Sequence, residues 1–199
     1  MIIGVAHSVL TPVSLWQQKK YYIPAPMSIS KAILGIFGWK VTGSIDPSLK
    51  KFVLIAAPHN SAMDFPLGLF ARNVIDRDIK YIGKDSLFKA PFGWLMRSLG
   101  GYPVDRSKSN NYVQSIVDIF NEHEEFAIAL APEGTRKKVE KFRTGFYYIA
   151  KGAGVPIVLV RFDQSKKEVH FDPKPFWPTD DSEADIEWIW HYYQDLLLK

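Results

Sequence analysis

Short apolar runs alternate with longer stretches of helical periodicity from about residue 44 to the end of the chain. Each run is rich in β-branched or aromatic residues and precedes apolar residues at helical spacing, an order typical of βαβ units. The runs predict strands at 52–57, 80–83, 102–104, 126–131 and 156–162, and an edge strand at 168–171. The helical spacing predicts helices at about 64–74, 87–98, 110–122, 141–152 and 182–197. We therefore expect a single α/β domain with a mixed, mostly parallel sheet flanked by helices.

The first 43 residues have a different pattern. Aromatic residues lie beside lysines at 16–22, and apolar residues at helical spacing predict a helix from Ser28 to about residue 39. Rings and ammonium groups suit the interface of an anionic membrane, whereas the same helix could instead pack on the body of the protein. We therefore divide the chain into an N-terminal arm with an amphipathic helix, residues 1–43, and a main domain, residues 44–199.

Composition excludes several classes of protein. The chain has 199 residues, of which 47% are apolar, so it can bury the core of one domain and is not disordered. It has no cysteine, which excludes disulfides, thiolate metal sites and cysteine nucleophiles. A net charge of +4 suggests anionic partners but lacks the strong bias of a nucleic-acid-binding protein. No run approaches the roughly 20 apolar residues of a membrane span, and no signal peptide is recognisable, so we expect a cytoplasmic protein, soluble or peripheral.

Polar clusters directly follow four of the predicted strands. In an open parallel sheet, ligands bind outside the carboxyl ends of the strands, so these clusters are expected to converge on one cleft. The clusters are His59 with Asn60 and Asp64, Lys84, Asp105 with Arg106, and Glu133 to Arg136.

His59 and Asp64 are five residues apart, a spacing that brings two side chains together in neither a helix nor a strand. A strand that ends near Pro58, a loop and a helix from about Asp64 could fold the carboxylate back onto the imidazole. Such a pair fixes the tautomer of the histidine and raises the basicity of its other nitrogen. Because the chain has no cysteine and no G-x-S-x-G turn, we predict that this pair deprotonates a substrate hydroxyl directly.

The segment Pro-Glu-Gly-Thr-Arg at 132–136 is a more specific signal than the His–Asp spacing. It places a carboxylate, a glycine, a hydroxyl and a guanidinium in one turn at a strand end. This combination suits a phosphorylated polyol, because the carboxylate can accept from a hydroxyl while the arginine and backbone N–H groups bind phosphate. The alternative is an ordinary tight turn before a helix.

Together these segments resemble the 1-acylglycerol-3-phosphate (lysophosphatidic acid) acyltransferase family of glycerolipid acyltransferases. The resemblance covers about residues 50–162, and four motif blocks occur in the order of the family. These blocks are HNSAMD at 59–64, GYPVDR at 101–106, PEGTR at 132–136 and VPIV at 155–158. Met63 and Ala131 stand where the family often has Trp and Phe, respectively.

The resemblance implies transfer of a fatty acyl group from acyl-CoA or acyl-ACP to the hydroxyl of a lysophospholipid, in phospholipid biosynthesis. The first candidate acceptor is 1-acylglycerol-3-phosphate. His59 would be the general base and Asp64 its orienting partner. The residues that would bind the acceptor are Lys84, Arg106, Glu133, Gly134, Thr135 and Arg136. The resemblance implies no metal and no cofactor besides the acyl thioester, and a protein peripheral on the cytoplasmic face of the membrane.

Other assignments stay open from the sequence. The acceptor could be another lysolipid, such as a lyso-aminolipid. A metal-dependent phosphoesterase could use His59, Asp64 and Asp105 as ligands of a hard cation, and a non-catalytic lipid-binding protein would keep the same apolar and basic surfaces. The basic run at 137–143 is either a solvated helix face or a surface for anionic headgroups or an acidic acyl carrier protein.

Overall fold

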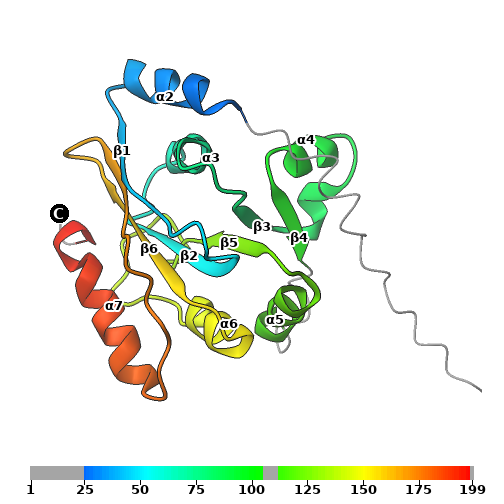
Figure 1. Cartoon of the computed structure of the whole chain (residues 1–199), viewed down its shortest axis with the longest axis vertical. Coiled ribbons are helices and arrows are strands. Elements are labelled where there is room, and N and C mark those ends of the chain that lie inside the picture. The colour runs from blue at the N-terminus through cyan, green and yellow to red at the C-terminus, as the bar shows by residue number, and fades with distance from the viewer. Residues whose placement is uncertain (1–24, 105–111, 198–199) are drawn as a thin grey trace, which may run out of the picture.

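A seven-stranded sheet forms the centre of the computed structural model, which describes residues 25–104 and 112–197 (Figure 1). The strands are β1 (Lys40–Gly43), β2 (Lys51–Ala57), β3 (Lys80–Lys84), β4 (Gly101–Val104), β5 (Phe126–Leu130), β6 (Ile157–Asp163) and β7 (Glu168–Phe171). Their order across the sheet is β1-β7-β6-β2-β5-β3-β4. All neighbouring strands are parallel except β6 and β7. The prediction of a mixed, mostly parallel sheet is therefore confirmed.

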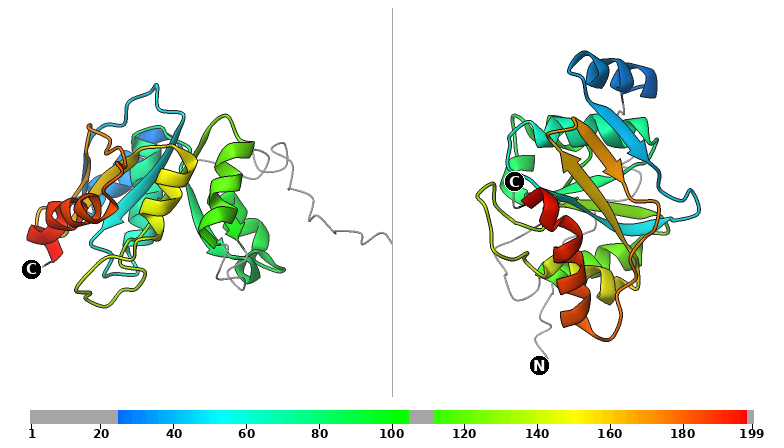
Figure 2. Two further views of the ribbon diagram at one scale, coloured as in Figure 1. Left: turned by 90° about the horizontal axis from the view of Figure 1, so that it is seen from below. Right: turned by 90° about the vertical axis from the view of Figure 1, so that its left-hand side faces the viewer.

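Helices cover both faces of this sheet (Figures 1 and 2). One face packs against α2 (Met27–Ile36) and α3 (Asp64–Val74), and the other against α5 (Tyr112–Glu122), α6 (Gly145–Ala153) and α7 (Ser182–Leu197). The short helices η1 (Asp85–Phe88) and α4 (Gly93–Ser98) lie between β3 and β4. Along β2, Phe52 and Leu54 pack into the core on the α3 side, while Val53 and Ile55 pack into the core on the α6 side. A strand covered on both faces needs apolar residues at consecutive positions, which explains the uninterrupted apolar run in the sequence.

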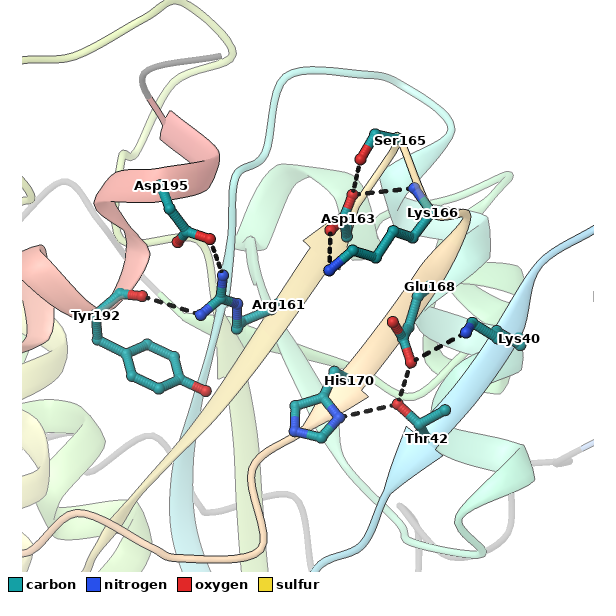
Figure 3. A network of polar contacts seen from close by, with 10 residues as sticks. All are labelled: Lys40, Thr42, Arg161, Asp163, Ser165, Lys166, Glu168, His170, Tyr192 and Asp195. Atoms are coloured by element: carbon teal, nitrogen blue, oxygen red, sulfur yellow. Dashed lines mark hydrogen bonds and ion pairs between the residues drawn. The ribbon is translucent and has the colours of Figure 1, made fainter.

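β1 is an additional edge strand that the apolar pattern does not predict (Figure 3). It pairs in parallel with β7, and the Thr42 hydroxyl donates to the Glu168 carboxylate at 2.7 Å and lies 2.9 Å from His170 Nδ1. The expectation that 168–171 forms the edge is therefore wrong, because β1 covers that strand. The helix predicted to about residue 39 ends at Ile36, since Gly38 adopts a φ of +75° and turns the chain into β1.

The single helix predicted at 87–98 is also wrong. Pro91 has no N–H and disfavours a helical conformation at the residue before it, so the segment divides into η1 and α4. The chain then doubles back so closely at Gly93 that a Cβ there would lie 2.0 Å from the Phe88 carbonyl oxygen. Only glycine fits at this position.

The helix predicted from residue 141 begins later, at Gly145. The preceding residues belong to the loop that follows β5: Phe142 is buried in the core, and the Arg143 N–H donates to the Pro132 carbonyl at 2.8 Å. The remaining predicted elements are confirmed to within about two residues, with residues 110–111 of one predicted helix outside the described range.

Candidate active site

The carboxyl ends of β2, β5 and β3 lie side by side at one edge of the sheet, because these three strands are parallel neighbours. The loop after β2 carries His59 and leads into α3, which begins at Asp64. The loop after β5 carries residues 131–144. The two polar clusters therefore meet at one place, although His59 and Glu133 are more than 70 residues apart in the chain.

His59 and Asp64 form the predicted pair. The His59 Nδ1 atom lies 3.4 Å from Asp64 Oδ2. The Asp64 side chain is fully buried, whereas the His59 side chain is 24% exposed. The carboxylate therefore fixes the ring from the protein side, and Nε2 is the nitrogen available to a ligand.

The Asp64 carboxylate is itself held at both oxygen atoms. The Ser61 N–H donates to Oδ2 at 2.8 Å, and the Gln164 side-chain amide donates to Oδ1 at 3.1 Å. Gln164 directly follows β6, the strand beside β2, so it reaches the pair from a third strand end. The sequence prediction missed this residue, although its position after a strand of the same sheet is the signal that could have found it.

Glu133 connects the two loops of the site. Its Oε1 atom accepts a hydrogen bond from the His59 backbone N–H at 2.7 Å, so the second cluster positions the backbone of the first. Burial raises the pKa of Glu133, the hydrogen bond from His59 opposes this rise, and the nearby Asp64 carboxylate adds to it. Its other oxygen, Oε2, is buried without a hydrogen-bond partner among the described residues. Because buried polar atoms are rarely left unpaired, Oε2 is suited to accept from a hydroxyl of a bound ligand.

The raised pKa of Glu133 gives a testable dependence of stability on pH. Neutral Glu133 stabilises the fold below the unfolded-state pKa, and this contribution is lost as pH rises through the raised folded-state pKa. Glu133→Gln stays neutral and keeps an acceptor oxygen. The melting temperature of Glu133→Gln minus that of the wild type is therefore expected to increase by about 2 °C from about pH 4 to pH 7. Calorimetry of both proteins checks this, with exposed Glu124→Gln as the control; a difference that does not change with pH would contradict it.

The 132–136 segment forms a tight turn that the residues after it stabilise by hydrogen bonds and packing. Gly134 has a φ of +63°, and a Cβ at this position would lie 2.6 Å from the Arg143 side chain. The Gly134 N–H donates to the Ala131 carbonyl, and the Thr135 hydroxyl accepts from the Lys137 N–H. Glycine is therefore favoured by the left-handed backbone, and any larger residue would also displace the Arg143 side chain.

α7 packs against this loop on the face of the sheet opposite α3. The ring of Phe142 packs edge-on against Trp190 and Tyr193, with centroids 4.9 and 5.7 Å apart. The buried Tyr193 hydroxyl donates to the Ile55 carbonyl of β2 and accepts from the Val160 N–H of β6. One helix thus ties the loop after β5 to the two strands that present His59 and Gln164.

A cleft of about 1310 Å³ opens at this edge. Its polar lining includes the predicted residues His59, Asp64, Glu133, Thr135 and Arg136, with Gly134 beside them, and also the basic residues Lys141 and Arg143. Its apolar lining includes residues of α3 and of the strands beneath it, among them Leu54, Phe65, Leu69 and Phe162. The volume exceeds the roughly 300–1,000 Å³ of typical small-molecule pockets, and the division into polar and apolar walls suits a large amphiphile.

The other predicted site residues are placed less completely. Lys84 is the last residue of β3, whose carboxyl end lies at the same edge. Asp105 and Arg106 lie outside the described residues. The basic run at 137–143 lies in the loop before α6, so the interpretation as a solvated helix face is wrong. Within residues 25–104 and 112–197, no group of three His, Asp or Glu side chains is placed to hold a metal ion.

A histidine whose Nδ1 faces a buried carboxylate, in an amphiphilic cleft at the strand ends of an α/β sheet, is chemically suited to deprotonate a hydroxyl. Residues 39–163 match the model of the Acyltransferase family, and the chain belongs to that family. The resemblance found in the sequence is thereby confirmed.

Comparison with individual proteins gives relatives that carry the name of an acyltransferase. The chain is 30% identical over 109 residues to 1-acyl-sn-glycerol-3-phosphate acyltransferase of Salmonella typhimurium, a match that covers 51% of this chain and 44% of the relative. It is 32% identical over 145 residues to the protein of the same name from Saccharomyces cerevisiae, which covers 66% of this chain and 45% of the relative. The matched region thus spans less than half the length of these relatives.

The fold is similar to that of a solved structure. The crystal structure of the 1-acyl-sn-glycerophosphate (LPA) acyltransferase PlsC from Thermotoga maritima superposes with a TM-score of 0.57. The similarity covers 95% of this chain and 83% of the other, at 19% sequence identity. The predicted glycerolipid-acyltransferase-like fold is therefore confirmed.

Proposed function

We propose that the protein transfers a fatty acyl group from acyl-CoA or acyl-ACP to the hydroxyl of a lysophospholipid, with 1-acylglycerol-3-phosphate as the first candidate acceptor. The observation that carries this proposal is the contact between His59 and the buried Asp64 at the mouth of an amphiphilic cleft. The names of the relatives support the choice of acceptor. Acylation of another lysolipid, such as a lyso-aminolipid, uses the same chemistry.

In the proposed reaction, His59 acts as the general base. Asp64 faces Nδ1, so Nε2 takes the proton of the acceptor hydroxyl as its oxygen attacks the thioester carbonyl. The tetrahedral intermediate collapses, the C–S bond breaks, and the proton on Nε2 passes to the leaving thiolate. The products are the diacyl lipid and the free thiol, and the histidine is neutral again. The thioester is already an activated acyl donor, so we propose that no metal or cofactor takes part; the activity is then expected to persist with a chelator.

The acceptor is proposed to bind at the turn after β5. Glu133 Oε2, which has no hydrogen-bond partner among the described residues, is proposed to accept from a hydroxyl of the glycerol backbone, with the Gly134 and Thr135 turn beside it. The exposed Arg136, together with Lys84 and Arg106, is proposed to bind the acceptor phosphate, because guanidinium groups bind phosphate through paired hydrogen bonds. The apolar walls along α3 would take an acyl chain.

We also propose that the protein is peripheral on the cytoplasmic face of the membrane. α2 leaves Ile29, Ile36 and Phe37 exposed while it buries Leu34 against the rest of the protein, as an interfacial amphipathic helix does. Among the residues that the structure describes, no helix has both the length and the apolar character needed to cross a bilayer.

The function is tested by release of free thiol from acyl-CoA and from acyl-ACP by the purified full chain. Each donor is combined with a panel of lysophospholipids and lyso-aminolipids. We expect thiol release that depends on one class of acceptor. Release that is absent with every combination would contradict the proposal, whereas vesicle binding without any release would favour the lipid-binding alternative.

Gln164 is expected to act as a positioning residue for this reaction. Gln164→Ala removes the hydrogen bond to Asp64 Oδ1, and a bond to a charged group is worth about 1.5–3 kcal/mol, of which solvent replaces a part. We expect kcat to fall about tenfold while KM changes less than about twofold. Steady-state kinetics with Gln194→Ala as control checks this, since Gln194 is a half-buried glutamine of α7 that contacts His191 of the same helix. An unchanged kcat would show that the hydrogen bond does not contribute to catalysis.

A further inference from the structure

The segment between β3 and β4 presents three large apolar side chains to solvent. Leu87, Phe92 and Trp94 are 53%, 67% and 65% exposed in the part of the chain that the structure describes. Single exposed apolar residues are ordinary, but three on one short segment, two of them aromatic, indicate a surface that binds a partner.

This exposure is enforced by packing beneath the segment. Phe88 is buried, its carbonyl accepts from Arg97 Nη1 at 2.8 Å, and the Arg97 guanidinium lies 5.5 Å from the centre of the Phe88 ring. The Gly93 N–H donates to the Lys89 carbonyl at 2.9 Å. With Phe88 and Gly93 fixed inside, Phe92 and Trp94 on either side of Gly93 are held outward.

The segment adjoins the active-site cleft. It starts at the carboxyl end of β3, at the same edge as the His59–Asp64 pair. Tyr81 of β3 packs edge-on against Phe65 of the cleft wall, with ring centroids 4.9 Å apart, and its hydroxyl donates to the Met96 carbonyl of α4 at 3.0 Å. Tyr81, which itself lines the cleft, thus connects the cleft wall directly to α4.

The charge at this edge identifies the partner. The neighbouring loop after β5 exposes Arg136, Lys137, Lys138, Lys141 and Arg143 with one carboxylate, Glu140, among them. On the segment itself, the Lys89 side chain is 72% exposed and lies 3.7 Å from Asp85. Basic side chains beside exposed Trp and Phe match an anionic bilayer, where rings enter the headgroup region and cations meet phosphates.

We propose that residues 85–94 are a membrane-docking element that inserts Phe92 and Trp94 into an anionic lipid surface and holds the mouth of the cleft against it. This deepens the proposed function, on which it rests, because a lysophospholipid could then pass from the bilayer into the cleft without crossing water. Neither docking residue lines the cleft, so the element can be altered without changing the acyl-transfer site.

Quenching of tryptophan fluorescence tests the insertion directly. The full chain is mixed with phosphatidylcholine–phosphatidylglycerol vesicles whose acyl chains carry bromine, without any acyl donor. Trp94→Phe is compared with Trp177→Phe as a control, because Trp177 is also exposed, at 57%. Trp177 follows Phe176, which pairs with Ile157 at the start of β6, so it lies at the end of the strands opposite the active site. We expect Trp94→Phe to lose most of the bromine quenching and Trp177→Phe to retain it. Quenching in Trp94→Phe equal to that of the wild type would overturn the proposal.

Vesicle co-sedimentation provides the second measurement. The double variant Phe92→Ser, Trp94→Ser is expected to bind these vesicles about tenfold more weakly, with Trp177→Ser unchanged. Equal vesicle binding by the double variant and the wild type would overturn the proposal. It would also be overturned if the wild type is a dimer and the double variant is a monomer that still binds vesicles as well as the wild type. Acyl transfer to a detergent-dispersed acceptor is measured separately. It is expected to remain in the double variant, so failure of docking and failure of the proposed function are distinguished.

Discussion

His59→Ala is expected to lower kcat for acyl transfer about 1,000-fold, within the roughly 10²–10⁴-fold contribution of a positioned general base. Without the imidazole, the acceptor hydroxyl must lose its proton to water while it attacks the thioester. His59 is partly exposed, and the substitution leaves the backbone hydrogen bond from residue 59 to Glu133 in place. The effect is therefore expected in kcat, with little change in the melting temperature.

The control for this variant is His191→Ala. His191 is an exposed histidine of α7 that contacts Gln194 and Glu187 of the same helix, so its loss is expected to leave kcat unchanged. Initial rates of thiol release, measured at saturating donor and acceptor, compare the two variants. A His59→Ala protein with more than about a tenth of the wild-type kcat would contradict the assignment of the base.

Asp64→Asn is expected to lower kcat about 100-fold, the second largest effect. Asp64 Oδ2 accepts from the Ser61 N–H and faces His59 Nδ1, whereas Oδ1 accepts from the Gln164 amide. An asparagine has one acceptor oxygen, so its amide N–H must face either an N–H donor or the histidine ring. With the amide nitrogen at the Oδ2 position, the ring adopts the tautomer that carries the proton on Nε2 and cannot act as a base. With the nitrogen at the Oδ1 position, it meets the Gln164 amide, and the ring keeps only an uncharged acceptor.

Steady-state kinetics of Asp64→Asn measures this effect, and the melting temperature of the variant shows whether it is folded. Asp118→Asn, in an exposed aspartate of α5 that accepts from Gln114, is the matched control. We expect KM to stay within about threefold of the wild type, because Asp64 is buried behind His59 and acts through it. A normal kcat in Asp64→Asn would show that the carboxylate does not orient the base.

Much of the fold follows from the apolar pattern. β2 and β6 are buried on both faces, so nearly every position in them is apolar, and this signal is visible without knowledge of their partners. β1 was missed because its four residues, KVTG, carry no such pattern and form a strand only through pairing with β7, more than 120 residues later. The break before α4 could have been predicted from Pro91 alone, since proline interrupts helices.

The site was predictable where its residues follow strands of the parallel sheet. This rule brought His59, Asp64 and the 133–136 turn to one cleft, as the structure places them. It did not reveal that Glu133 accepts from the His59 backbone, because that contact depends on the register between β2 and β5. The same rule applies to Gln164, which follows β6, but its hydrogen bond to Asp64 depends on the register between β2 and β6.

The connection between His59 and Glu133 makes the two motifs one structural unit. Glu133 Oε1 accepts from the His59 backbone N–H, and Oε2 has no hydrogen-bond partner among the described residues. Phe142, in the loop that carries Glu133, packs against Trp190 of α7. This geometry explains why a proposed acceptor site and a proposed base occur on adjacent strands.

The central claim is that this protein makes a diacyl lipid by direct attack of the acceptor hydroxyl on an acyl thioester, with His59 as base. Mass spectrometry of the lipid formed from 1-acylglycerol-3-phosphate and an isotope-labelled acyl-CoA or acyl-ACP measures it most directly. We expect labelled diacyl product with the wild type and a rate about 1,000-fold lower with His59→Ala. No labelled product with either donor, or product formed equally fast by His59→Ala, would contradict it.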